Sequence, residues 1–139
     1  MTTRETLIPG PDHPITIEKT AGRVVARVGG RIVADSTRAL TLQEASYPAV
    51  QYIPLDDVDE ALLAASEKQT YCPYKGDASY YSIVLPEGGA GGEGAKVAEG
   101  ALTDAVWIYR EPYPAVSLIA GHVAFYTDRV EVDVIPEGV

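Results

Sequence analysis

The sequence predicts a mainly β protein, built as a small β-sandwich or open barrel with one or two short helices. Three observations indicate this fold class. Short segments rich in Val, Ile, Tyr and Thr recur along the chain, and turn signals separate them about every eight to twelve residues. A Gly-Gly pair joins two of these segments, as in a tight β-hairpin. The length of 139 residues suffices for one hydrophobic core, so a single domain over 15–139 is expected.

The first part of the chain is expected to form strands after an irregular N-terminal arm. Residues 1–14 contain Pro9, Pro11 and Pro14 and are interpreted as that arm. Gly29-Gly30 is typical of a type I′ or II′ turn, because both glycines can adopt φ > 0. Alternating or apolar patterns predict strands at 15–19, 23–28, 31–36, 39–43 and 50–53.

The second part is expected to contain the helices. The clearest one is predicted after Pro54, where Asp56 or Asp57 can cap it and 61–65 (Ala-Leu-Leu-Ala-Ala) are good helix formers. A short helix at 115–120, ended by Gly121, is expected near the C-terminus. Five glycines between 88 and 94 predict a flexible hairpin tip. Strands are predicted at 79–85, 105–109, 123–126 and 130–135.

Composition and charge exclude several classes of function. The net charge of −9 argues against binding nucleic acid or anionic membranes, both of which require exposed Lys and Arg. No apolar run approaches the roughly 20 residues of a membrane span, and the N-terminus lacks a signal-like apolar stretch, so a cytoplasmic location is expected. One cysteine excludes an internal disulfide and a multi-cysteine zinc site, and with only two histidines no metal site is predicted.

The aromatic residues are unevenly distributed. The chain has nine Tyr against one Phe and one Trp, and no Tyr lies in the first 46 residues. If the strands at 79–85 and 105–109 pair as a hairpin, Tyr71, Tyr74 and Tyr80 come close to Trp107 and Tyr109. Alternation then places Trp107 and Tyr109 on one face. Such a group can form a pocket for a cation or a flat ring, whereas core packing is the alternative interpretation of any single tyrosine.

The segment 72–75 combines a thiol, a phenol and an amine within four residues. Pro73 restricts its own backbone and that of Cys72, so the segment is expected to be rigid. A nearby Lys75 ammonium would favour the Cys72 thiolate, and His122 could serve it as a base. The alternatives are that Cys72 is a small buried hydrophobic residue and that Lys75 forms an ion pair with Asp77 or another acid.

Other polar residues have two interpretations each. His122 is either an acid–base or pocket residue, or a histidine that interacts with the last carbonyls of the short helix. Arg38 either reaches an acidic ligand or pairs with a neighbouring carboxylate. Asp57 and Asp59 form a D-x-D pair that fits the first turn of the predicted helix better than a metal site. His13, in the N-terminal arm, is expected to be solvated.

Several phrases of the sequence resemble a known family. The most specific is Cys72-Pro73-Tyr74-Lys75-Gly76, and the others are 34–40, Tyr47-Pro48 with Tyr52, Trp107-Ile108-Tyr109, Ile119-Ala120-Gly121-His122 and Phe125-Tyr126. Between Pro14 and Val132 the chain resembles the bacterial family of domain of unknown function 427, whose members are sometimes labelled nucleotidyltransferase domains. The resemblance implies a mostly β fold related to the β-tent, with these motifs around a pocket, and it implies no established activity or cofactor.

These observations favour a protein that binds a small organic ligand in a Tyr/Trp-lined pocket. One alternative is an enzyme that uses Cys72 or Lys75 covalently with assistance from His122. Nucleotidyl transfer finds no support in the residues, because the glycines at 88–94 lack the Lys-Ser/Thr of a P-loop. Another alternative is an interaction module that presents sheet edges and an acidic face to a basic partner. The residues predicted to line the pocket are Cys72, Tyr74, Lys75, Trp107, Tyr109 and His122.

Overall fold

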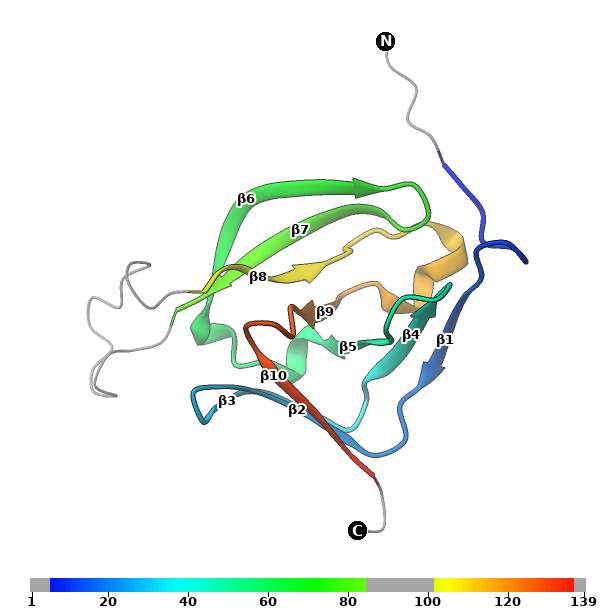
Figure 1. Cartoon of the computed structure of the whole chain (residues 1–139). Coiled ribbons are helices and arrows are strands. Elements are labelled where there is room, and N and C mark those ends of the chain that lie inside the picture. Colours follow the sequence, from blue (N-terminus) through cyan, green and yellow to red (C-terminus); the bar gives the residue numbers. More distant parts are fainter. Residues whose placement is uncertain (1–5, 85–101, 137–139) are drawn as a thin grey trace.

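Ten strands and three short 3₁₀ helices form the part of the chain that the computed structural model describes, residues 6–84 and 102–136 (Figure 1). The prediction of a mainly β fold with few short helices is confirmed, and the strands do not close into a barrel. The glycine-rich tip predicted at 88–94 lies outside the described residues. The strands are β1 (Ile15–Lys19), β2 (Arg23–Val28), β3 (Arg31–Ser36), β4 (Leu40–Glu44), β5 (Val50–Pro54), β6 (Leu63–Cys72), β7 (Gly76–Ile83), β8 (Leu102–Ile108), β9 (His122–Phe125) and β10 (Glu131–Ile135).

The strands form two antiparallel sheets. Seven strands pair in the order β1-β4-β5-β9-β8-β7-β6, and three pair in the order β10-β2-β3. Figure 1 shows that the seven-stranded sheet is curled, with β6, β7 and β8 above β5, β4 and β1, and that the three-stranded sheet crosses below. The larger sheet therefore has one face toward the smaller sheet and one concave face.

Each face of the larger sheet carries its own apolar cluster. The cluster that includes Ile53, Ile108 and Phe125 also contains residues of the smaller sheet and forms the core between the sheets. The cluster on the concave face includes Tyr52, Tyr80, Tyr109 and Ala124. Tyr80 belongs to this second cluster and Tyr81 packs against the first, because consecutive residues of a strand point to opposite faces. The sequence predicted this division of the two tyrosines.

Local patterns predicted the first strands and their turn correctly. Strands β1, β2 and β3 have the predicted bounds. Gly29 (φ +58°) and Gly30 (φ +85°) join β2 to β3, and Val28 pairs directly with Arg31. Both glycines therefore have the positive φ that a two-residue type I′ connection requires.

The α-helix predicted after Pro54 is wrong. The chain there forms two 3₁₀ turns, η1 (Leu55–Asp57) and η2 (Glu60–Leu62), and strand β6 begins at Leu63. The Asp59 side chain caps η2 by accepting a hydrogen bond from the Ala61 N–H at 3.3 Å. Helix propensity over 61–65 is a weak preference, and pairing of β6 with β7 together with burial of Leu62 outweighs it.

A short helix near the C-terminus is present, as predicted, although it is a 3₁₀ helix. This helix, η4 (Pro114–Ile119), precedes Gly121, whose φ is +74°. Val116 and Ile119 are buried in the cluster of the concave face, so η4 covers one end of that face. None of the helices described is long and apolar enough to cross a membrane.

Candidate functional site

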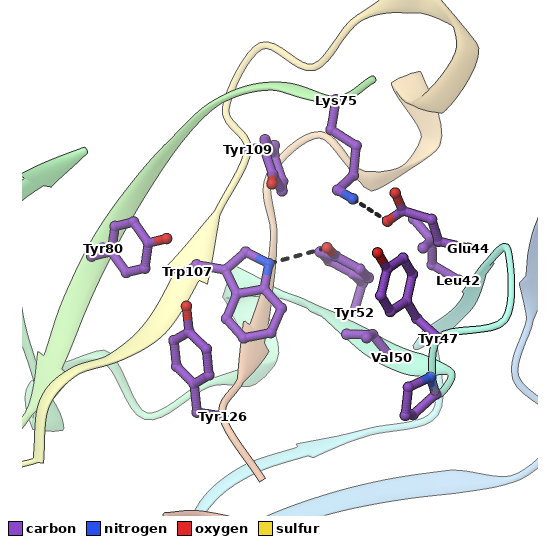
Figure 2. A pocket seen from close by; sticks show the side chains of 11 residues that line it. Leu42, Glu44, Tyr47, Val50, Tyr52, Lys75, Tyr80, Trp107, Tyr109 and Tyr126 are labelled. Atoms are coloured by element: carbon purple, nitrogen blue, oxygen red, sulfur yellow. Dashed lines mark hydrogen bonds and ion pairs between the residues drawn. The ribbon is translucent and has the colours of Figure 1, made fainter. Parts of the chain in front are cut away.

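A cavity of about 250 Å³ lies on the concave face of the larger sheet (Figure 2). One wall comes from β4, β5 and the loop between them, and the opposite wall comes from β7, β8 and the residues that follow β8 and β9. The turn between β6 and β7 contributes a lysine. The lining residues are Leu42, Glu44, Tyr47, Pro48, Val50, Tyr52, Lys75, Tyr80, Trp107, Tyr109 and Tyr126.

Strand register brings the aromatic residues of the second wall together. Tyr80 on β7 pairs directly with Trp107 on β8. Tyr109 follows two residues after Trp107 and therefore lies on the same face. Trp107 and Tyr109 both belong to the apolar cluster of the concave face. This agrees with the predicted hairpin, in which strand 79–85 pairs with strand 105–109 and the two residues share a face. Tyr126 follows β9 and packs its ring against that of Trp107, with 4.6 Å between centroids.

The turn from Cys72 to Gly76 directs Lys75 toward the cavity. The Lys75 N–H donates to the Cys72 carbonyl at 3.2 Å, and the Lys75 carbonyl accepts from the Tyr113 N–H at 3.0 Å. Gly76 has φ +109°, a conformation that side-chain-bearing residues rarely adopt, so this turn requires a glycine. The Lys75 side chain is only 10% exposed.

A network of three charged or polar groups lies at one end of the cavity. The Lys75 ammonium donates to Glu44 Oε1 at 2.5 Å, and His13 Nε2 lies 2.8 Å from Glu44 Oε2. The His13 ring stacks on Tyr74, with 4.1 Å between centroids and 8° between planes. The expectation that His13 is solvated is therefore wrong, because the N-terminal arm packs against the β6–β7 turn. The Leu7 N–H also donates to the Pro73 carbonyl at 2.9 Å.

Glu44 remains ionised in this network. Burial opposes the charged form, but hydrogen bonds from Lys75 and His13 outweigh burial and hold the pKa of Glu44 below its ordinary value. Lys75 thus pairs with a carboxylate that lies 31 residues away in the sequence, which agrees with the alternative of an ion pair with another acid. The cavity lining therefore carries one positive and one negative charge that compensate each other.

Three phenols of the cavity, those of Tyr52, Tyr109 and Tyr126, remain protonated at neutral pH. Burial raises the pKa values of Tyr52 and Tyr109 far above the ordinary value, and it raises that of Tyr126 to about 12. Tyr52 accepts a hydrogen bond from Trp107 Nε1 at 3.1 Å, so its own O–H is available as a donor. Figure 2 shows the Tyr52 and Tyr109 hydroxyls pointing into the space between Trp107 and Lys75.

The structure brings three of the six predicted pocket residues, Lys75, Trp107 and Tyr109, around this cavity. Cys72 is half-buried and packs against the same apolar cluster as Tyr109, but it does not line the cavity. Tyr74 lies outside the cavity as well, since its ring stacks on His13.

His122 lies away from both the cavity and Cys72. His122 Nδ1 is 3.0 Å from the Ala120 carbonyl, close to the end of η4. This contact agrees with the interpretation of His122 as a histidine that interacts with the last carbonyls of the short helix. Strand β9 is separated from β6 by three inter-strand steps, which corresponds to roughly 14 Å between backbones. The fold therefore does not assemble the Cys–His pair on which the enzymatic alternative depends.

Two further predicted residues have structural partners. Arg38 pairs with a neighbouring carboxylate, because its guanidinium lies 2.9 Å from Asp57 Oδ1. Tyr71, predicted to join the aromatic group, instead has its hydroxyl 2.6 Å from that of Tyr113. Within residues 6–84 and 102–136, no three His, Cys, Asp or Glu side chains gather in a way that could hold a metal ion.

Sequence reasoning missed several lining residues. Tyr47 and Tyr52 occur in one of the phrases that resemble the family, so that resemblance was a signal for them. Tyr126 also occurs in such a phrase, next to Phe125. Glu44 had no signal, because a carboxylate at the end of a strand is identified as a partner of Lys75 only once β4 and the β6–β7 turn are brought together.

Comparison with known families agrees with the resemblance seen in the sequence. Residues 16–136 match the family described as "Domain of unknown function (DUF427)". No curated protein matches the chain in sequence. The match covers most of the 139 residues and includes every strand of the fold except the first residue of β1. The chain therefore belongs to the family of domain of unknown function 427.

Proposed function

We propose that this protein binds a small, planar molecule without net charge in the cavity that Tyr52, Trp107 and Tyr109 help to line. One observation carries the proposal. Among the residues that the structure describes, five tyrosines and a tryptophan line the cavity, and the only charged side chains of the lining, Lys75 and Glu44, are already paired with each other. The volume of about 250 Å³ is slightly below the range typical of drug-sized ligands, so a molecule with a single ring is the best match.

The compensated charges favour an uncharged ligand. A carboxylate would have to compete with Glu44 for the Lys75 ammonium, and a cation would have to compete with Lys75 for Glu44. Either ligand would be desolvated in the cavity with an incompletely paired charge, which is unfavourable. A neutral polar molecule leaves the ion pair intact.

The phenols favour a ligand that accepts hydrogen bonds. The raised pKa values of Tyr52 and Tyr109 keep both hydroxyls protonated, and Tyr52 already accepts from Trp107, which leaves its O–H to donate. A carbonyl oxygen is a suitable acceptor for such groups. The aromatic rings that line the cavity, Trp107 among them, provide flat surfaces on which a planar ligand can stack.

The test uses three probes that share a ring and differ in charge: benzamide, benzoate and benzylammonium. Trp107 is the only tryptophan of the chain, so its fluorescence reports on this cavity. We expect benzamide to give a saturable change with a Kd of about 1 mM, as is usual for a ligand of this size, and the two charged probes to bind at least several times more weakly.

Two variants separate cavity binding from a general effect. Tyr109→Phe removes one donor and is expected to weaken benzamide about two- to tenfold. Tyr71→Phe makes the same chemical change outside the lining and is expected to leave the Kd unchanged. The proposal fails if no probe gives a saturable change, or if either charged probe binds more tightly than benzamide.

A further inference from the structure

A second cavity of about 440 Å³ adjoins the first. The two share Tyr47, Pro48, Val50, Trp107 and Tyr126, so a ligand in one can extend into the other without leaving the protein surface. The additional residues that line the second cavity are Ala49, Gln51, Phe125, Thr127, Val132 and Val134. We call the second cavity the apolar groove, because no Asp, Glu, Lys, Arg or His of residues 6–84 and 102–136 contributes to its lining.

The groove exists because two neighbouring strands of the larger sheet pair only briefly. Strand β5 pairs with β9 at Ile53↔Val123 and Pro54↔His122 and nowhere else. The pairing does not extend to Val50 at the start of β5 or to Tyr126, which follows β9. Both of these residues line the groove. Strand β10 of the smaller sheet borders it on the other side, through Val132 and Val134.

Exposed apolar side chains border this groove. Tyr47 is 61% exposed and Val134 is 44% exposed, and both lie in its lining. Apolar side chains left exposed around a concave surface are typical of a binding site. The first cavity, by contrast, contains the Lys75–Glu44 pair and the donor phenols. The two compartments therefore differ in polarity while Trp107 and Tyr126 form a common wall.

We propose that the ligand is an elongated amphipathic molecule, with its planar polar head in the first cavity and an apolar tail in the groove. The proposal rests on the binding function of the first cavity and specifies the class of ligand. Continuity between the compartments favours the tail of the same molecule as the occupant of the groove, because Val50, Trp107 and Tyr126 line both compartments.

The experiment uses benzamides with a para-alkyl chain from methyl to hexyl, titrated against Trp107 fluorescence. We expect the Kd to fall about two- to fourfold for each added methylene until the groove is filled, because each buried methylene transfers apolar surface out of water. Equal Kd values for the methyl and hexyl probes would overturn the proposal of a tail site, and saturable binding of both would leave the function of the first cavity standing.

Two variants test the location of the tail. Val134→Asp places a charge at the groove, and Ala49→Phe, at an exposed loop position, fills part of it. Both are expected to remove most of the difference between hexyl and methyl probes while leaving the Kd of the methyl probe unchanged. Ile32→Asp is the matched control, because Ile32 is 45% exposed on the same small sheet and does not line the groove.

Three further outcomes would overturn the inference. The tail does not occupy the groove if Val134→Asp changes the Kd difference between hexyl and methyl probes no more than Ile32→Asp does, and if Ala49→Phe leaves that difference unchanged as well. If the protein sediments as a dimer that Val134→Asp dissociates, a second copy of the chain covers the groove. If no benzamide of the series binds, the proposed function of the first cavity fails and the tail site fails with it.

Discussion

Replacing Glu44 by glutamine removes the negative charge that holds Lys75 and His13 at the cavity. The substitution keeps the size and shape of the side chain, so its main effect is to leave the Lys75 ammonium without a counter-ion. The Lys75 side chain is 10% exposed and that of Glu44 is 18% exposed, so water replaces the lost partner only partly. We expect the folded state to lose stability at neutral pH.

The magnitude follows from the degree of burial. Breaking a fully buried ion pair costs about 3–5 kcal/mol, whereas breaking an exposed pair costs about 0–1 kcal/mol. The Lys75–Glu44 pair is nearly buried but opens onto a cavity, so we expect about 2–3 kcal/mol. The exposed Arg23–Asp35 pair is a matched control, and Asp35→Asn is expected to cost less than about 1 kcal/mol.

The pH dependence distinguishes the charge of Glu44 from a packing effect. The pKa of Glu44 is lower in the folded than in the unfolded protein, so its contribution to stability is complete above the unfolded pKa. The contribution is lost as the pH falls through the folded pKa, because the wild-type side chain is then protonated. The difference between wild type and Glu44→Gln should therefore disappear in acid.

Urea unfolding followed by Trp107 fluorescence measures the difference, at about pH 7 and at several values down to about pH 3. Thermal unfolding should show a decrease in Tm of roughly 4 °C per kcal/mol for a chain of this size. The reasoning is refuted if Glu44→Gln costs no more than Asp35→Asn at neutral pH, or if its cost is the same at both ends of the pH range.

Three other measurements test the structure. Gly22→Ala should cost more than about 2 kcal/mol in urea unfolding, because the new Cβ would lie 2.2 Å from a backbone oxygen of β10, whereas Gly29→Ala meets no atom within 4 Å and should cost less. Tyr52→Phe removes the acceptor of the Trp107 N–H and should shift the emission maximum and cost about 1 kcal/mol; an unchanged spectrum would contradict that hydrogen bond. Burial raises the pKa of Tyr126 to about 12, so stability should fall as the pH rises above about 10, and Tyr126→Phe should make unfolding midpoints between about pH 9 and about pH 11 less dependent on pH.

Much of the fold could be predicted because the local pattern and the tertiary structure agree. The alternation in β1, β2 and β3 and the Gly29-Gly30 turn depend on neighbouring residues, and the structure has them as predicted. The region after Pro54 shows where this reasoning fails. Residues 61–65 have the composition of a helix, but pairing with β7, more than ten residues further along the chain, makes Leu63 and its successors a strand.

The candidate site divides in the same way. Trp107 and Tyr109 could be singled out because they alternate on a strand that pairs with 79–85, and Lys75 because it stands in a turn rich in reactive groups. Tyr74 and His122 were equally plausible in sequence, yet one stacks on His13 and the other contacts the Ala120 carbonyl. Their position relative to the cavity depends on how the sheet curls, which no local pattern encodes.

The sequence by itself determined the strands, the tight turns and the kinds of side chain available for a site, because strand periodicity and glycine conformations are properties of short segments. Only the tertiary structure decided that Glu44 neutralises Lys75 and that Trp107 donates to Tyr52, 55 residues away. It also decided that β5 and β9 separate to open the apolar groove. The physical reason is that these contacts join segments distant in sequence, so they depend on the pairing and curvature of whole strands.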